Sequence, residues 1–186
     1  MEKGVGVARI HTHLDMTNTA IDTLIWQALE LYSVDLLPQF LTDGSTRVRM
    51  AAARAIQLKG GDSEFELARG LLRAAKRHDR ELGAFILGQL GTPSLPYREQ
   101  SIPLLNEVLK IDSAACVRAS AAAALGHLRA IEVVESLIAA ATDRSPEVRA
   151  GVASALARFP RSKKTIACLD KLSRDSDEKV RYWAED

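Results

Sequence analysis

The chain has 186 residues, of which 25 are lysine or arginine and 24 are aspartate or glutamate, so its net charge is close to zero. A nucleic-acid-binding domain usually carries a basic excess or a basic face, and this balance argues against that class. Two cysteines are too few for a disulfide framework, and no apolar run approaches the ~18 residues of a membrane-spanning helix. No signal peptide is evident at the start, and we expect a cytoplasmic protein.

Residues 1–16 show no hydrophobic period and contain Gly4 and Gly6, which predicts a flexible lead-in. His11 and His13 have the His-x-His spacing of some metal sites, but a metal centre needs further ligands that are held rigidly. We therefore expect neither a metal nor a cofactor. Residues 17–186 are predicted to form one repeat array that begins with an N-terminal helix over 17–32. Its apolar residues fall at helical spacing: Ile21, Leu24, Ile25, Ala28, Leu29 and Tyr32.

Five helix pairs are predicted after this helix, over residues 34–61, 62–91, 98–129, 130–160 and 162–186. Gly60-Gly61 ends the second helix of the first pair, because glycine adopts the left-handed geometry after a helix at little cost. Residues 92–97 contain two prolines and are predicted to form an inserted loop. In the fourth pair, Ser145 is expected to cap the second helix and Pro146 to occupy its first position.

A Val-Arg dipeptide recurs at 48–49, 117–118, 148–149 and 180–181, and each arginine has an aspartate six residues before it. A fifth copy, centred on Arg80, lacks both the valine and that aspartate. The arginines lie 31, 38, 31 and 32 residues apart, a period typical of stacked helical repeats. Because a catalytic site is needed only once, the repetition predicts a structural ladder of charge-assisted hydrogen bonds. Its expected members are Asp43, Arg49, Arg80, Asp112, Arg118, Asp143, Arg149, Asp175 and Arg181.

The pattern Asp-x5-Arg is followed by an alanine-rich helix and by Leu-Gly-x-Leu, as in Leu125-Gly126-His127-Leu128. This pattern resembles HEAT repeats over about residues 34–186, and most of all the PBS-lyase HEAT-like subclass. The resemblance implies an all-α fold, a right-handed α-α superhelix (HEAT-like solenoid) with about five helix pairs plus an N-terminal helix. The strings at 57–61, 83–89 and 116–119 are similar to bacterial HEAT-repeat proteins, some of which are encoded beside Rhs-type toxins. That similarity implies toxin neutralisation as one candidate function.

The sequence has no Gly-x-Ser-x-Gly elbow, phosphate loop or dinucleotide fingerprint. HEAT-like hydroxylases bind iron through His-Glu dipeptides, which this chain lacks. The prediction is a non-enzymatic protein–protein interaction module, either a toxin-neutralising protein or a scaffold. One alternative is an accessory subunit or chaperone of an enzyme, as in the bilin lyases, and another is nucleic-acid binding.

The second helix of each pair also predicts a binding surface. With each motif arginine at position zero, positions −1, +3, +7 and +10 form the core, and positions +1, +5 and +8 point away from it. The second helices line the concave face of a HEAT solenoid, so these positions and +9 are expected to line a groove for a toxin or enzyme partner. The candidates are Met50, Arg54, Gln57, Glu81, Phe85, Gln89, His127, Ser154 and Arg158. Phe85 is the expected anchor, unless it packs beneath the inserted loop.

The fifth repeat stops at Asp186, five residues after Arg181, and lacks the last two core positions of the other copies. We expect its last helix to fray or to be held by a neighbouring molecule. Two explanations stay open: a longer array that has been truncated, and an end completed by another subunit. The second explanation predicts self-association through the C-terminal end.

Overall fold

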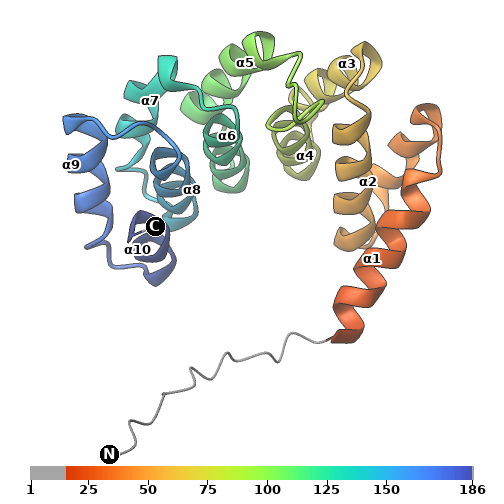
Figure 1. Ribbon diagram of the computed structural model, residues 1–186, viewed down its shortest axis with the longest axis horizontal. Helices are drawn as coiled ribbons and strands as arrows, with labels where there is room; N and C mark the ends of the chain where they lie inside the picture. Colours follow the sequence, from red (N-terminus) through yellow and green to blue (C-terminus); the bar gives the residue numbers. More distant parts are fainter. Residues whose placement is uncertain (1–15, 186) are drawn as a thin grey trace, which may run out of the picture.

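A computed structural model describes residues 16–185 and shows ten α-helices and two 3-10 helices in an open arc, with no strand in that range (Figure 1). Five helix pairs follow one N-terminal helix, which confirms the expected all-α solenoid. Residues 1–15, where the flexible lead-in and the His11 and His13 pair were expected, lie outside the described residues.

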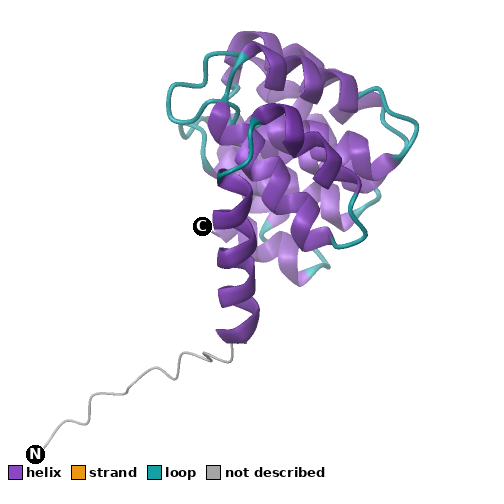
Figure 2. Ribbon diagram, turned by 90° about the vertical axis from the view of Figure 1, so that its right-hand side faces the viewer, coloured by secondary structure: helices purple, strands orange, loops and turns teal. Residues whose placement is uncertain are grey.

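One helix of each pair lies on the inner side of the arc and the other on the outer side (Figure 1). The inner helices are α2 (Thr46–Lys59), α4 (Arg77–Leu87), α6 (Ala115–His127), α8 (Pro146–Ala157) and α10 (Glu178–Glu185). The outer elements are η1 (Val34–Thr42), α3 (Asp62–Leu71), α5 (Arg98–Ile111), η2 (Ile131–Val133) with α7 (Val134–Ala140), and α9 (Lys163–Leu172). Helix α1 (Met16–Glu30) packs against α2 and extends below the other helices in the side view (Figure 2).

Two outer elements differ from regular α-helices. One is η1, a 3-10 helix that contains Pro38, because proline lacks the N–H group that an α-helix would use. The other begins with η2, a short 3-10 helix before α7.

The expected side-chain cap at Ser145 is wrong. Ser145 stands at the N-cap position, but its side chain makes no capping bond; its amide instead donates to Oδ1 of Asp143 at 2.8 Å. Pro146 begins the helix as expected.

The core is one continuous layer between the inner and outer helices. The expected core positions of the third repeat, Val117, Ala121, Leu125 and Leu128, are all at most 2% exposed. The same buried cluster includes leucines of the outer elements, among them Leu37, Leu105, Leu137 and Leu172. Because each repeat buries its apolar face only against its neighbours, stability is shared along the stack. No helix within residues 16–185 is long and apolar enough to cross a membrane.

The inserted loop is held by Tyr97. Its ring stacks on Phe65 with centroids 4.8 Å apart, and its hydroxyl hydrogen-bonds Asp62 at the start of α3. The aromatic residue beside the loop is therefore Phe65 and not Phe85, whose ring contributes to the inner side of the arc.

Candidate protein-binding groove

Each motif arginine first binds the turn that precedes its own helix. Nη1 of Arg118 donates to the carbonyl oxygens of Asp112 and Ser113, at 2.8 and 3.2 Å. Arg149 repeats these contacts with the carbonyls at 143 and 144, and Arg181 repeats them with those at 175 and 176. These bonds satisfy turn carbonyls and fix the direction of the guanidinium group.

The other edge of the guanidinium reaches the next repeat. Nε and Nη2 of Arg118 donate to the two carboxylate oxygens of Asp143, both at 2.9 Å. Arg80 binds Asp112 and Arg149 binds Asp175 in the same bidentate way. Each aspartate also accepts the amide of the residue two positions later. The ladder, defined as Arg80–Asp112, Arg118–Asp143 and Arg149–Asp175, therefore ties α4 to the turn before α6, α6 to the turn before α8, and α8 to the turn before α10.

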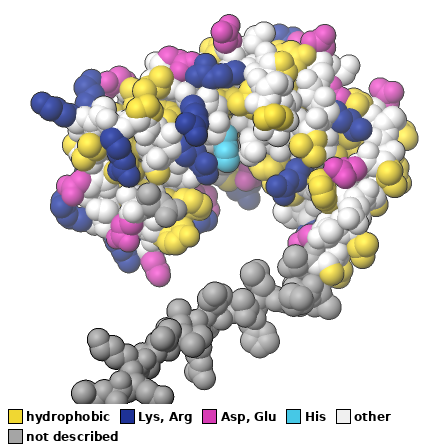
Figure 3. All heavy atoms as spheres, in the orientation of Figure 1, with side chains coloured by type: hydrophobic (Ala, Val, Ile, Leu, Met, Phe, Trp, Pro, Cys, Tyr) yellow, Lys and Arg dark blue, Asp and Glu magenta, His cyan; other side chains and the backbone are white. Residues whose placement is uncertain are grey.

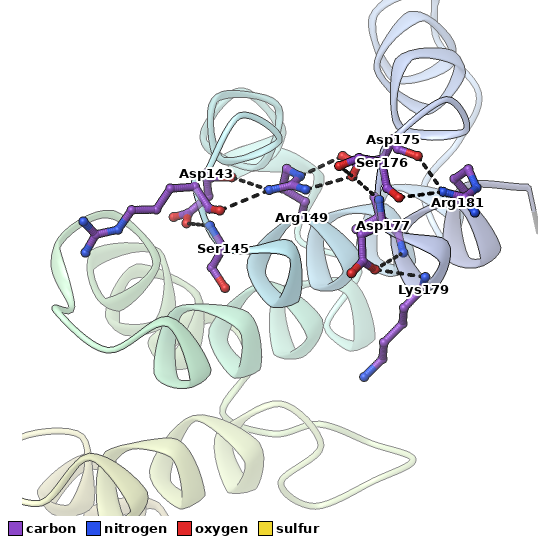
Figure 4. Close-up of polar contacts among 10 residues, drawn as sticks. Asp143, Ser145, Arg149, Asp175, Ser176, Asp177, Lys179 and Arg181 are labelled. Carbon is purple, nitrogen blue, oxygen red and sulfur yellow. Dashed lines mark hydrogen bonds and ion pairs between the residues drawn. The ribbon is translucent and has the colours of Figure 1, made fainter.

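The ladder has two open ends. Ala74 stands where Arg49 would meet an aspartate, and Arg49 donates instead to the Thr46 hydroxyl and to carbonyls of its own turn. At the other end Arg181 keeps its own-turn bonds to the backbone of Asp175 and Ser176 (Figure 4). Within residues 16–185 no carboxylate forms an ion pair with Arg181.

The ladder shifts the pKa values of its members in the direction that favours the charged pairs. Hydrogen bonds from Arg149 lower the pKa of Asp175 to about 2, and those from Arg80 lower the pKa of Asp112. Burial opposes the shift at Asp143, but the bonds from Arg118 and from the Ser145 amide outweigh it and the pKa is lowered. All three carboxylates are thus charged well below neutral pH.

Stability is expected to fall in acid because of these shifts. A carboxyl with a pKa near 3.9 in the unfolded chain and about 2 at Asp175 in the folded chain stabilises the fold above pH 4. That contribution is lost as the pH falls from about 4 through 2. After screening by solvent it amounts to roughly 1–2 kcal/mol for Asp175. Urea unfolding followed by circular dichroism at pH 5, 4, 3 and 2.5 measures it, and Asp175→Asn should show a shallower decline than the parent.

The inner side of the arc carries a groove, visible as the hollow between the two ends of the molecule (Figure 3). Its N-terminal part is a depression of about 330 Å³ between α1, α2 and α4. A middle depression of about 420 Å³ crosses α4, α6, α8 and α10, and a smaller one of about 220 Å³ lies between α8 and α10. Phe85 and Glu81 lie one turn apart on α4 and connect the first depression to the second.

Positions +1 and +5 of the inner helices line this groove. Met50, Arg54 and Phe85 line the N-terminal depression, Glu81 and Ser154 the middle one, and Arg158 the C-terminal one. The floor of the middle depression is formed by small residues: Ala119, Ser120, Ala123, Ala150 and Gly151. A floor of this kind leaves room for the backbone and side chains of a bound segment.

The assignment of position +8 to the groove is wrong in the first three repeats, whereas in the fourth repeat Ala157 lines the C-terminal depression. Gln57 is only 4% exposed, and its amide nitrogen donates to the carbonyl oxygen of Phe85 at 2.5 Å. The equivalent Gly88 and Gly126 face Ala124 and Ala155 of the following inner helix. In these three repeats position +8 is thus the contact between successive inner helices, since the stack turns that side of each helix toward its neighbour.

Position +9 lies at the C-terminal ends of the inner helices. Gln89 is half-buried, whereas His127 and Arg158 are exposed. Partial burial of the imidazole lowers the pKa of His127, and the charge of Arg158 lowers it further. The residue as a whole is still in contact with solvent. His127 is therefore mostly neutral at pH 7. Of these three side chains Arg158 lines the C-terminal depression, and the place of Gln89 and His127 at the groove stays a prediction.

Sequence reasoning missed the two tryptophans of the groove. Trp26 of α1 lines the N-terminal depression, together with the ion pair between Asp22 and Arg47. Trp183 of α10 lines both of the other depressions. Trp26 falls outside the apolar stripe of its helix. A tryptophan in such a position was the one sign in the sequence that this side of the helix has a contact of its own. Its place in the groove depends on how α1 packs, and no motif of the repeat encodes that packing.

The last helix is regular to Glu185 and packs against α8, with Val180 and Ala184 buried and Trp183 half-buried. Tyr182 is 62% exposed at this end. Neither fraying nor a neighbouring molecule is needed to hold the helix in place.

No group of three His, Cys, Asp or Glu side chains within residues 16–185 is placed to hold a metal ion.

Comparison with known proteins gives matches of the same architecture. Residues 102–186 match the family model of HEAT repeats. The curated relative YibA of Escherichia coli K12 is 31% identical over 156 residues, which is 81% of this chain and 55% of YibA. An X-ray structure of YibA superposes with a TM-score of 0.79 and 25% identity, over 98% of this chain and 63% of that one. The chain therefore spans little more than half of the relative it matches.

More distant solved structures share the fold alone. The complex of CpcE and CpcF of phycocyanin lyase from Nostoc sp. PCC7120 gives a TM-score of 0.56 at 17% identity, covering 98% of this chain and 76% of that chain. A designed armadillo repeat protein in complex with the peptide (KR)4 gives 0.55 at 15% identity, covering 94% and 93%. The repeat match and these superpositions identify the described chain as a helical solenoid of the HEAT and armadillo type.

Proposed function

We propose that this chain is a non-enzymatic protein-binding module and that its partner lies in the concave groove. The observation that carries this proposal is the groove itself. An aromatic wall stands at each end, Trp26 with Phe85 at one and Trp183 at the other, and small residues form the floor between them. Aromatic side chains in desolvated pockets supply most of the binding energy of protein interfaces. A groove that crosses all five inner helices fits a helix or extended segment of a partner.

The chemistry of the groove favours a protein over a nucleic acid. Its charged side chains are of both signs, with Glu81 and Glu147 beside Lys179 in the middle depression. A phosphate backbone would need a continuous basic track. Arg54, which belongs to no ion pair among residues 16–185, offers one charged contact beside the N-terminal aromatic wall.

Two specific versions of this function are proposed from the sequence resemblance, both for a cytoplasmic protein. In the first version the chain is a toxin-neutralising protein or a scaffold. In the second version it is an accessory subunit of an enzyme. The lyase CpcE–CpcF and the peptide-bound designed protein have the same fold, which supports a binding role without naming the partner. A purified partner separates the two versions: a toxin should lose activity when this chain is added, and an enzyme should gain it.

Phe85→Ala is expected to weaken partner binding by about 2 kcal/mol or more, or roughly 30-fold in Kd, because the substitution removes an aromatic anchor from the groove. Affinity capture with mass spectrometry would identify the partner, and titration calorimetry with the purified partner would measure the change. Ala123→Arg, which fills the floor, should abolish binding.

The matched control for this series is Ile166→Ala, which removes an apolar side chain that is 49% exposed on the outer helix α9. Its Kd should equal that of the parent. If Ile166→Ala weakens binding while Ala123→Arg does not, the partner binds the outer face and the proposed function of the groove is wrong.

A further inference from the structure

Four exposed basic residues lie where α6 and α8 end. Arg129 follows α6, Arg158 and Arg161 follow α8, and Lys163 begins α9. None of the four forms an ion pair with a residue of the range 16–185. These four residues are called the basic edge below, and their charges are open to a ligand from outside.

The two helix ends lie next to each other. Helices α6 and α8 pack together, and Gly126 lies against Ala155 near these ends. Burial first, and then the charge of Arg158, lower the pKa of His127, the last residue of α6. Lysine and arginine side chains gather over α6 and α8 in Figure 3. The basic edge is therefore one local patch and not a set of scattered charges.

The acidic residues of the same loops do not neutralise the patch. Residues 127–135 and 158–165 contain two acidic residues, Glu132 and Glu135. Glu132 pairs with Arg98 and Glu135 with Lys164, so each already has a basic partner. The whole chain has a net charge of only +1, and four unpaired cations in one place are a clear local excess. A surface of this kind attracts a ligand of opposite charge.

The backbone of Arg129 gives a second, independent indication. Its φ is 48°, in the left-handed region, and the equivalent positions of the first two repeats are Gly60 and Gly91, with φ of 63° and 71°. Glycine adopts this conformation at less cost than arginine, whose Cβ atom is crowded there. Arg129 therefore costs the fold stability, and no ion pair of its side chain within residues 16–185 offsets that cost. Unfavourable backbone geometry of this kind is concentrated at binding sites.

The basic edge continues the groove. Arg158 belongs to both, because it lines the C-terminal depression together with Ser154, Ala157 and Trp183. A partner segment that leaves the groove at this depression passes Trp183 and meets Arg158 first. The other residues of the basic edge follow in the turns after α6 and α8.

We propose that the basic edge binds an acidic segment of the protein partner, at one end of the stretch that occupies the groove; this inference rests on the function proposed above. Three of its four residues are arginines, and the planar guanidinium group binds a carboxylate through two hydrogen bonds. Complementary charge of this kind speeds association and selects the partner. A nucleic acid fits less well, because phosphates that continued along the groove would meet Glu81 and Glu147.

The probe is a fluorescein-labelled peptide of twelve residues that repeats glutamate-glutamate-leucine, titrated with the full chain and followed by fluorescence anisotropy. We expect a Kd on the order of 10–100 µM in 50 mM NaCl and a rise of about tenfold in 300 mM NaCl, because salt screens exposed charges. Reversal of two charges, in the double variant Arg129→Glu, Arg161→Glu, should raise the Kd by about tenfold or more. The same peptide with glutamine in place of glutamate should not bind.

Arg129→Gly should act in two opposite directions. It should raise the melting temperature, because glycine adopts the left-handed backbone at less cost. It should also raise the Kd of the glutamate peptide by about threefold, because one cation of the basic edge is lost. A merely structural role of Arg129 would change the melting temperature and leave the Kd as it is.

The matched control is the double variant Arg73→Glu, Lys110→Glu, which changes the net charge by the same amount on the ladder side of the arc. Both residues are exposed; Arg73 precedes the turn that Arg80 binds, and Lys110 lies beside Arg118 and Asp143. Its Kd for the glutamate peptide should stay near that of the parent. Circular dichroism checks that each variant is folded.

Three outcomes with the probe would overturn the proposal: no binding of the glutamate peptide at 1 mM, equal binding of the glutamine peptide, and equal loss of binding in the control variant. Tighter binding of a labelled single-stranded DNA of twelve nucleotides, lost in the Arg129→Glu, Arg161→Glu variant, would assign the basic edge to nucleic acid instead.

A captured partner separates this inference from the proposed function. If Ala123→Arg abolishes binding of that partner and the Arg129→Glu, Arg161→Glu variant leaves it unchanged, the groove binds the partner and the inference about the basic edge is wrong. If Ala123→Arg leaves binding intact, the proposed function of the groove is itself wrong.

Discussion

Arg118→Ala is expected to lower the free energy of unfolding by roughly 2–4 kcal/mol. Arg118 is only 8% exposed and donates four hydrogen bonds, two to Asp143 and two to turn carbonyls. Its removal leaves a carboxylate in a half-buried site without its counter-ion. Chemical unfolding at pH 7 measures the loss.

The control is Arg174→Ala. Arg174 also holds an aspartate through two hydrogen bonds, but both partners of that pair are more than half exposed. Exposed pairs contribute about 0–1 kcal/mol, so this variant should unfold close to the parent. Arg118→Lys should recover only part of the stability, because an ammonium group cannot form the bidentate contact. Equal losses for Arg118→Ala and Arg174→Ala would show that the ladder does not stabilise the stack.

Gly126→Ala is expected to cost about 2 kcal/mol, although alanine is the better helix former. A Cβ atom at Gly126 would lie 2.6 Å from Cα of Ala155 and 2.8 Å from its Cβ. The obstacle is the backbone of α8, which a rotamer change cannot move, so α6 and α8 have to separate. Overpacking of this kind costs about 1–3 kcal/mol. Thermal and urea unfolding measure the net loss.

Gly70→Ala is the matched control. Gly70 is helical, and a Cβ atom there meets nothing within 4 Å. The substitution should therefore stabilise the protein by about 0.5–1 kcal/mol, through helix propensity alone. Combining Gly126→Ala with Ala155→Gly should restore part of the stability, since one of the two clashing atoms is removed. Opposite signs at the two glycines would show that the spacing between inner helices, and not glycine itself, sets the cost.

The sequence by itself determined the repeat and the helix pairs, and it named the six residues that pair in the ladder; Asp43, Arg49 and Arg181, which it also named, have only local partners. These features follow from local rules: a 3.6-residue period, the residue types that begin and end helices, and a motif that returns about every 32 residues. The core positions of the third repeat were predicted from the motif and are buried. The departure at the second inner turn, Ala74 in place of an aspartate, was visible in the sequence and leaves Arg49 with local partners only.

Only the tertiary structure decided what the two sides of each inner helix face. Helical periodicity tells whether a residue points toward the core, but the rotation between successive repeats decides whether an outward position meets solvent or the next helix. Gln57 points away from its own core and is still buried, because α4 covers it. Trp26 reaches the groove for the same reason: its position depends on how α1 packs on α2, and a single helix read alone does not show that packing.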